Sequence, residues 1–174
     1  DVTLQRTPLD PRQWREALQE YDAICPCVAD RVSADLFAGL KPRTRLLANY
    51  GVGYNHIDLA AAKAHGIVVT NTPDVLTDAT ADLAMTLMLM LARRAGEGER
   101  QLRRGEWQGW YPTHLMGTMV TGATLGIIGM GRIGQAVARR ARAFGLQIHY
   151  HNRRRVAPHI EQELEATYWD SLDQ

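Results

Sequence analysis

The segment that most constrains the fold of this chain is a glycine-rich turn between two apolar runs. Residues 125–128 (LGII) form an apolar run of strand length and lead directly into 129–134 (GMGRIG), which has the spacing G-x-G-x-x-G. A helical segment follows at 135–144, Gly145 ends it, and 146–150 has the character of a second strand. A strand, a glycine turn, a helix and a second strand in this order are typical of a dinucleotide-binding Rossmann unit. The sequence therefore predicts a parallel α/β sheet with a nucleotide site at this turn.

Each glycine of the motif has an expected role. Gly129 makes the tight turn, Gly131 lets the backbone approach a pyrophosphate without an intervening Cβ, and Gly134 lets the helix pack close to the strand. The N–H groups at the start of the helix, with those of Arg132 and Ile133 among them, are expected to bind the phosphates. The alternative is a tight turn that holds no ligand.

The end of the second strand indicates which dinucleotide is bound. An NAD site usually has Asp or Glu about 20 residues after the motif, where it binds the ribose 2′-hydroxyl. Here Asn152 stands at that place and is followed by Arg153, Arg154 and Arg155. Guanidinium groups suit a 2′-phosphate, which a carboxylate would repel. The pattern favours NADP(H), while NAD(H) stays possible if Asn152 alone serves the ribose and the arginines are solvated.

The first half of the chain also alternates strand and helix signals, which predicts a second parallel sheet. Strands are expected at 23–28, 46–50 and 67–70, and helices at 11–20, 33–40 and 59–65. A long helix is then expected over 81–104, with residues 83–91 apolar almost all round and therefore buried. The loop 105–121 contains Trp107 and Trp110, and long aromatic loops are commonly functional or interfacial.

Composition excludes several classes of protein. Hydrophobic residues make up 45% and charged residues 22% of the 174 residues, which is a globular composition. A net charge of +1 argues against nucleic-acid and membrane partners, and the apolar stretch within 79–92 is too short for a membrane span. Cys25 and Cys27 are expected to be reduced small core residues of a cytoplasmic protein, and no metal-binding pattern is found.

Three motifs together resemble the D-isomer-specific 2-hydroxyacid dehydrogenases, and most of all their glyoxylate/hydroxypyruvate reductase branch. Residues 49–58 (NYGVGYNHID) are similar to the substrate loop of that family. The segments TNTP (70–73), LT (76–77) and ADLA (81–84) resemble its crossing between domains, and 124–134 (TLGIIGMGRIG) its nucleotide fingerprint.

The resemblance implies two α/β domains, each incomplete in this chain. Residues 1–78 would be a flavodoxin-like substrate domain without its first strand, and 79–174 the N-terminal part of a Rossmann domain with the interdomain helix. The backbone N–H groups of Val52 and Gly53 would bind the substrate carboxylate, in keeping with the anion nest that such a turn can form. Thr77 would lie near the nicotinamide end of the cofactor, or cap the helix, or both.

The family's catalytic groups are an Arg in an Ala-Arg-Gly context, a Glu, and a His that donates the proton. No Ala-Arg-Gly occurs here, so we expect these groups beyond Gln174 and none of them within this chain. His56 lies beside the substrate loop and is expected to cap or pack there. We therefore expect an interior fragment of a longer enzyme, inactive by itself.

The resemblance further implies hydride transfer between a nicotinamide and a small 2-oxo acid such as glyoxylate or hydroxypyruvate. A homodimer is expected from the charged end of the long helix and its aromatic loop. The alternative function is a non-catalytic, dinucleotide-sensing module of the corepressor type on the same scaffold.

Overall fold

The computed structural model describes residues 2–173, which fold as two compact units. The first unit is Asp1–Val75 and the second is Leu76–Gln174, each with its own core. The boundary expected from the sequence lies after residue 78, three residues further along the chain. The roles assigned there to the two domains remain predictions.

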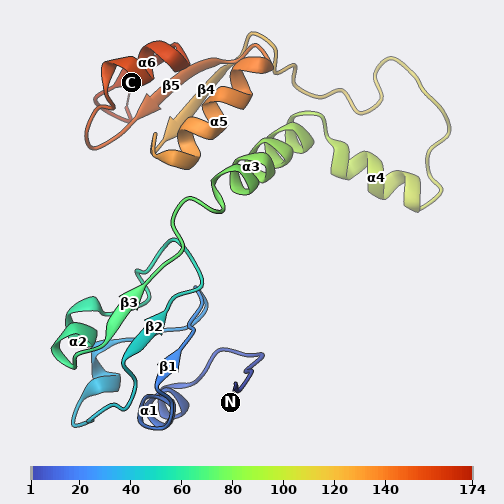
Figure 1. The fold of residues 1–174 in the computed structure, drawn as a ribbon. Coiled ribbons are helices and arrows are strands. Elements are labelled where there is room, and N and C mark those ends of the chain that lie inside the picture. Colours follow the sequence, from blue (N-terminus) through green and yellow to red (C-terminus); the bar gives the residue numbers. More distant parts are fainter. Residues whose placement is uncertain (1, 174) are drawn as a thin grey trace. The chain divides into compact units, whose positions relative to one another are not determined.

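The first unit is a three-stranded parallel sheet with helices packed against it (Figure 1). Its strands have the order β1-β2-β3, and Trp14, Leu18, Phe37 and Leu47 lie in its core. The elements are α1 (Pro11–Glu20), β1 (Ala23–Ile24), the 3-10 helix η1 (Ala34–Phe37), β2 (Leu46–Ala48), α2 (Leu59–Ala64) and β3 (Val68–Thr70).

Local sequence explains where α1 begins. The Asp10 side chain accepts a hydrogen bond from Gln13 N at 2.8 Å, and Gln13 Oε1 accepts one from Asp10 N at 3.0 Å. This capping box satisfies two N–H groups at the helix end, and Pro11 stands at the first position, where no N–H is needed. The amphipathic helix then buries Trp14 and Leu18 against the sheet.

The first strand is shorter than the sequence predicts. The expected strand 23–28 is β1 over two residues, followed by an isolated parallel bridge between Cys27 and Tyr50. Pro26 has no N–H to donate to a ladder, and only its carbonyl pairs, with Tyr50 N at 2.8 Å. Cys25 is exposed, so the expectation of a core residue is wrong there; both thiols are free.

The second unit is also a three-stranded parallel sheet, of order β4-β5-β6, and α5 and α6 cover it (Figure 1). Ile148 and Tyr150 of β5 point into the core, where they meet Ala138, Ala141 and Leu164. The elements are α3 (Thr77–Ala92), α4 (Ala95–Arg103), β4 (Thr124–Ile128), α5 (Arg132–Ala143), β5 (Gln147–His151), α6 (Pro158–Leu164) and β6 (Ala166–Trp169).

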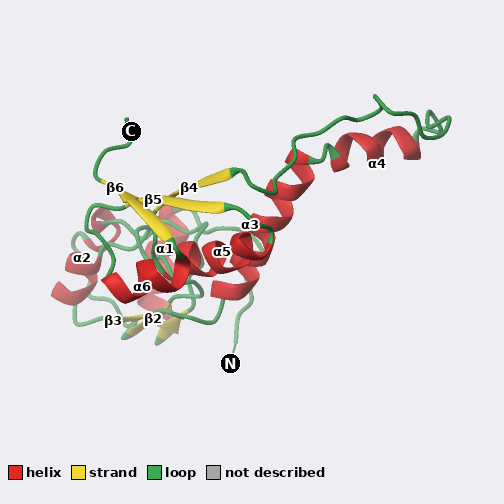
Figure 2. Cartoon of the chain, turned by 90° about the horizontal axis from the view of Figure 1, so that it is seen from above, coloured by secondary structure: helices red, strands yellow, loops and turns green. Residues whose placement is uncertain are grey.

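The expected single helix 81–104 is wrong, because two helices occupy this region. α3 ends at Ala92 and α4 begins at Ala95, with Arg94 between them at φ 52° in the left-handed region. A contact from far along the chain stabilises the break, since the carbonyl of Ala92 accepts a hydrogen bond from Thr118 N at 2.7 Å. The backbone of Gly117 also packs there, and a Cβ on it would lie 2.3 Å from Ala92 O. α4 and the loop after it form an arm that extends away from the sheet of this unit (Figure 2).

The apolar half of α3 is less buried than expected. Ala81 and Met85 are buried, but Leu83, Leu87 and Leu91 are 57%, 58% and 83% exposed. These three leucines recur every four residues and so form one stripe along the helix. α3 packs through its other side against α5.

Candidate functional site

The glycine turn of the second unit joins β4 to α5 as the sequence predicts. Gly129 has φ 99°, which strongly favours a residue without Cβ. α5 begins at Arg132, three residues earlier than expected, because Gly131 takes the extended conformation that precedes the first helical residue. No side chain caps this end of α5. The first N–H groups of a helix have no partner within it, so the turn presents donors to a ligand.

The space around the two other glycines of the motif differs. A Cβ on Gly134 would lie 2.3 Å from Gly129 O, so the close approach of helix and turn requires glycine. A Cβ on Gly131 would meet no atom within 4 Å, so the surface beside the turn is open. Gly131 is therefore not required by the packing of the chain itself, and its open face can accommodate a pyrophosphate. Ile133 lies half-buried in the first turn of α5, and its role as a phosphate donor remains a prediction.

Asn152, just beyond the end of β5, holds the glycine turn in place. Its Oδ1 accepts a hydrogen bond from Met130 N at 2.7 Å, and His151 O accepts one from Gly129 N at 3.0 Å. On the other side, Gln135 Nε2 donates to Met130 O at 3.2 Å. The oxygen of Asn152 thus accepts one hydrogen bond from the turn, and its amide nitrogen donates to no acceptor among residues 2–173.

The three arginines that follow Asn152 differ in their surroundings. Arg155 makes a two-pronged ion pair with Glu161, with both N···O distances 2.7 Å, and its guanidinium lies 5.5 Å from the Tyr168 ring centre. This pairing, with a second hydrogen bond from Tyr150, lowers the pKa of Glu161. Arg153 and Arg154 are exposed and have no ion-pair partner among residues 2–173. Of the three arginines, these two are therefore the ones without a charged partner in that part of the chain.

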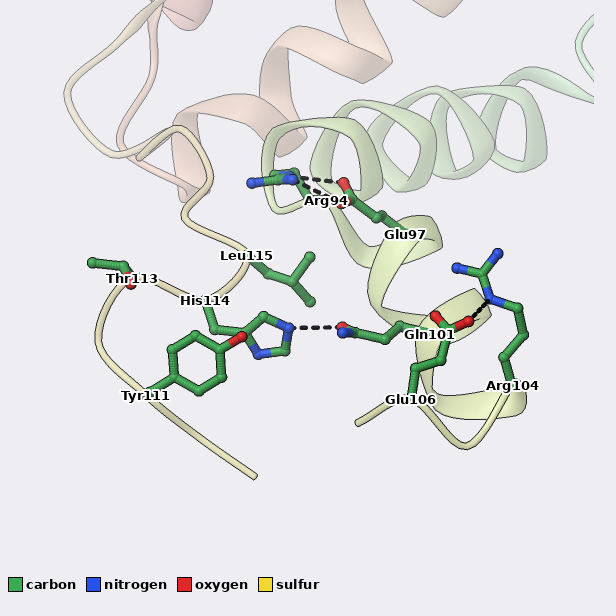
Figure 3. Close-up of a pocket in the computed structure, with 9 residues that line it drawn as sticks. All are labelled: Arg94, Glu97, Gln101, Arg104, Glu106, Tyr111, Thr113, His114 and Leu115. Atoms are coloured by element: carbon green, nitrogen blue, oxygen red, sulfur yellow. Dashed lines mark hydrogen bonds and ion pairs between the residues drawn. The ribbon is translucent and has the colours of Figure 1, made fainter. Parts of the chain in front are cut away.

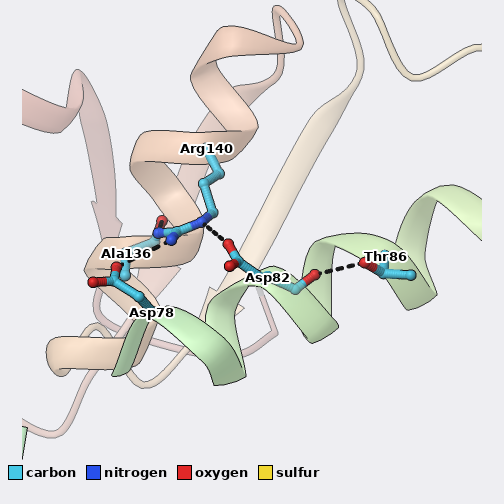
Figure 4. Close-up of polar contacts among 5 residues, drawn as sticks. All are labelled: Asp78, Asp82, Thr86, Ala136 and Arg140. Atoms are coloured by element: carbon cyan, nitrogen blue, oxygen red, sulfur yellow. Dashed lines mark hydrogen bonds and ion pairs between the residues drawn. The ribbon is translucent and has the colours of Figure 1, made fainter. Parts of the chain in front are cut away.

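Thr77 is the first residue of α3, four residues before the expected start of that helix. It is half-buried, and no side chain caps this helix end, so a capping role for its hydroxyl is not observed. The same end of α3 is tied to α5 by Arg140, whose guanidinium donates to Asp78 at 3.0 Å and to Asp82 at 2.6 Å (Figure 4). Its third bond goes to Ala136 O at 3.1 Å within α5. Arg140 therefore links the helix that carries Thr77 to the helix that follows the glycine turn.

The predicted carboxylate-binding turn of the first unit follows β2. The carbonyls of Gly51, Val52 and Gly53 all accept hydrogen bonds from neighbouring side chains or backbone. Neither Val52 N nor Gly53 N donates to an acceptor in the described part of the chain. Successive free N–H groups at a turn of this kind suit an anion. The side chains that hold the turn, Asn49 and Asn71, were not singled out from the sequence as functional residues.

The remaining titratable groups do not assemble a second site. Across residues 2–173, no three His, Cys, Asp or Glu side chains are grouped so as to hold a metal ion. Within the same residues, no helix is long and apolar enough to cross a membrane. His56 is hydrogen-bonded to Asn49, the side chain that also holds the turn 51–53. This contact is of the kind expected for a packing or capping residue.

The arm contains a polar cavity of about 290 Å³ between α4 and the loop after it (Figure 3). Its charged side chains are paired with one another, Arg94 with Glu97 and Arg104 with Glu106. His114 lies 2.7 Å from Gln101 Oε1 and stacks on Tyr111. These pairings stabilise the arm and leave no free charge to bind a ligand among the residues that line the cavity.

The sequence of the chain also matches a known protein family. Residues 1–166 match the family model of the D-isomer specific 2-hydroxyacid dehydrogenase catalytic domain. The glyoxylate reductase of Thermococcus litoralis is 47% identical over 98% of this chain and 53% of its own length. The glycerate dehydrogenase of Hyphomicrobium methylovorum is 40% identical over 91% of this chain and 49% of its own. The chain spans about half the length of the curated relatives it matches.

A solved structure of the same family has a similar fold. A Polaromonas sp. protein, described as a NAD-binding D-isomer specific 2-hydroxyacid dehydrogenase, superposes with a TM-score of 0.86 at 46% identity. The match covers 96% of this chain and 52% of that one. The fold of parallel α/β units is therefore shared with this group of proteins.

Proposed function

The chain belongs to the D-isomer-specific 2-hydroxyacid dehydrogenase family, and from this we propose that the whole protein is an NAD(P)H-dependent reductase of small 2-oxo acids. The observation that carries the proposal is the turn from β4 to α5, with a left-handed Gly129, an open Gly131 and an uncapped helix end. Glyoxylate and hydroxypyruvate are the substrates we expect, because relatives at 47% and 40% identity are named glyoxylate reductase and glycerate dehydrogenase.

In this proposal the residues of the chain bind and orient the two reactants. Bound nicotinamide supplies the hydride. The N–H groups of Arg132 and Ile133 hold the pyrophosphate at the N-terminus of α5, where the helix dipole favours an anion. Val52 N–H and Gly53 N–H bind the carboxylate of the 2-oxo acid, and Thr77 lies near the nicotinamide end. We assign no proton donor to the described residues, in line with the resemblance, which expects the catalytic Arg, Glu and His elsewhere.

Turnover separates the enzyme from the alternative, a dinucleotide-sensing module. The test follows the absorbance of NADPH with the whole protein and either glyoxylate or hydroxypyruvate. We expect oxidation of the cofactor that depends on the 2-oxo acid, with a kcat in the range of about 1–10³ s⁻¹. Tight cofactor binding without any turnover on small 2-oxo acids would favour the sensor instead.

We propose further that NADPH is preferred over NADH. Support comes from Arg153 and Arg154, which are exposed and lack partners in the described chain, and from the amide at position 152 where an acid would select NAD. Loss of charged hydrogen bonds to a 2′-phosphate should weaken NADPH at least about tenfold in Arg153→Ala/Arg154→Ala, with NADH spared. Arg155→Ala is a control for loop structure, because Arg155 is paired with Glu161. Equal weakening of both cofactors would contradict the preference.

A homodimer is proposed as the assembly of the whole protein. The arm exposes Trp107, Trp110 and Met119 by 53%, 82% and 71%, and α3 adds the leucine stripe. Exposed apolar surface of this extent is characteristic of an interface. Light scattering should give the mass of two protomers at micromolar concentration, and Trp110→Lys should shift it toward one. A wild-type monomer would contradict the proposal.

The free thiols of Cys25 and Cys27 support a reducing, cytoplasmic location.

A further inference from the structure

Asn49 is one of two polar side chains that are buried among the described residues, and it lies directly beneath the carboxylate-binding turn. Its exposed fraction is 2%. Both protons of its amide are used, because Nδ2 donates to Gly51 O and to Gly53 O, each at 3.0 Å. One side chain therefore grips the first and last carbonyls of the three-residue turn.

These two bonds determine the orientation of the Asn49 amide. The orientation in turn determines which ring nitrogen of His56 carries the proton. Carbonyl oxygens only accept, so the nitrogen of Asn49 must face the turn and Oδ1 must face His56. The distance from His56 Nε2 to that oxygen is 2.9 Å. Because Oδ1 is also only an acceptor, Nε2 must carry a proton. His56 is thus held as the Nε2–H tautomer.

The middle carbonyl of the turn is held in the same manner from another element. Asn71, which follows β3, donates from Nδ2 to Val52 O at 2.9 Å, and Thr72 N donates to Gly51 O at 3.1 Å. All three carbonyls are therefore turned toward donors of the protein. The carbonyls of Gly51 and Val52 belong to the same peptides as the N–H groups of Val52 and Gly53. Rotation of either peptide would point a partially negative oxygen toward the place where the substrate carboxylate is expected.

We propose that Asn49 is a positioning residue for the substrate carboxylate. His56 acts through it, because its donation to Oδ1 adds to the two carbonyl bonds that keep the Asn49 nitrogen toward the turn. The inference rests on the proposed reduction of 2-oxo acids. It assigns to His56 a role in binding the 2-oxo acid, and no proton transfer to substrate. The side-chain hydrogen bonds of both residues stay within the first unit, from Asn49 to the loop 51–53 and from His56 to Asn49.

Kinetics of the whole protein test the proposal with a matched pair of substitutions. His56→Leu keeps bulk but removes the donor, and should raise the KM for the 2-oxo acid about tenfold, the equivalent of one lost hydrogen bond. The Kd for NADPH should stay within about twofold, because the cofactor turn lies in the other unit. His56→Gln restores an N–H donor and should recover most of the wild-type KM. Asn49→Asp, which turns an oxygen toward two carbonyls, should have the largest effect.

A second measurement is independent of turnover. Long-range ¹H–¹⁵N NMR of histidine rings in the whole protein should show His56 as the Nε2–H tautomer, and a mixture of tautomers in Asn49→Ala. If no 2-oxo acid is reduced by the wild type but this tautomer is found, the proposed function fails while the network stands. An Nδ1–H tautomer, equal loss of affinity for both reactants, or no rescue by glutamine would each overturn the positioning role.

Discussion

Replacement of Tyr150 by Phe removes the hydroxyl that holds the loop between β5 and α6, which carries Arg153 and Arg154, and leaves the ring in place. Tyr150 lies on β5 with 1% of its surface exposed. Its hydroxyl donates to Glu161 Oε1 at 2.5 Å and accepts a hydrogen bond from Val156 N at 3.2 Å. The phenol thus connects β5 both to α6 and to the end of the loop that carries Arg153 and Arg154.

The cost of the substitution follows from what is left unpaired. Val156 N–H is half-buried and loses its acceptor, whereas Glu161 keeps its ion pair with Arg155. An unsatisfied, partly buried donor costs about 1–3 kcal/mol, so we expect the free energy of unfolding near pH 8 to fall by about 2 kcal/mol.

The effect should depend on pH in a defined direction. Burial, together with the hydrogen bond to Glu161, raises the pKa of Tyr150 to about 12. An unfolded tyrosine ionises near pH 10, so the folded state holds its proton more tightly there. The stability that this phenol contributes is fully present below about pH 10 and is lost as the pH rises to about 12. The deficit of Tyr150→Phe should therefore shrink over this range.

Urea unfolding monitored by tryptophan fluorescence at pH 8 and at pH 11 measures both effects. Tyr111→Phe is the matched control, since that ring is 49% exposed and its hydroxyl makes no hydrogen bond within residues 2–173. The reasoning is refuted if Tyr150→Phe is as stable as the wild type at pH 8, or if its deficit is the same at both pH values.

Two further substitutions test the second unit. Arg140→Gln should lower the midpoint of urea unfolding more than Arg139→Gln, because Arg140 binds two carboxylates and Arg139 only one. The difference between the two midpoints should become smaller in 1 M salt, which screens the ion pairs. Equal midpoints at low salt would be evidence against the link between α3 and α5. Gly131→Ala should fold with wild-type stability yet weaken NADPH at least about tenfold, since its Cβ meets only the expected ligand. Gly134→Ala should lose stability itself, because its Cβ would lie 2.3 Å from Gly129 O; circular dichroism and equilibrium cofactor binding distinguish the two outcomes.

Local signals in the sequence were enough to predict the parallel sheets and the turn at 129–134. The glycine spacing and the apolar runs beside it are each read within a few residues, and the structure forms a strand, turn and helix there. The structure confirms the α/β class, and the relatives of the chain confirm the family.

The errors arose where a contact from far along the chain decides the local structure. The break after Ala92 depends on Thr118 N, 26 residues away, and no residue near Ala92 signals it. The leucines of α3 are apolar but exposed, because periodicity shows which faces are apolar and not what packs on them. Asn49 and His56 are likewise joined across a turn by one hydrogen bond, which residue spacing alone does not indicate.

Transfer of isotope tests the central claim most directly. NADPH that carries deuterium on the transferable position of nicotinamide C4 is incubated with the whole protein and hydroxypyruvate, and the product is analysed by mass spectrometry and chiral chromatography. The account predicts glycerate of the D configuration with one deuterium at C2. Failure to form glycerate, an L product, or glycerate without deuterium would contradict a D-specific reductase that transfers hydride from the cofactor bound at residues 129–134.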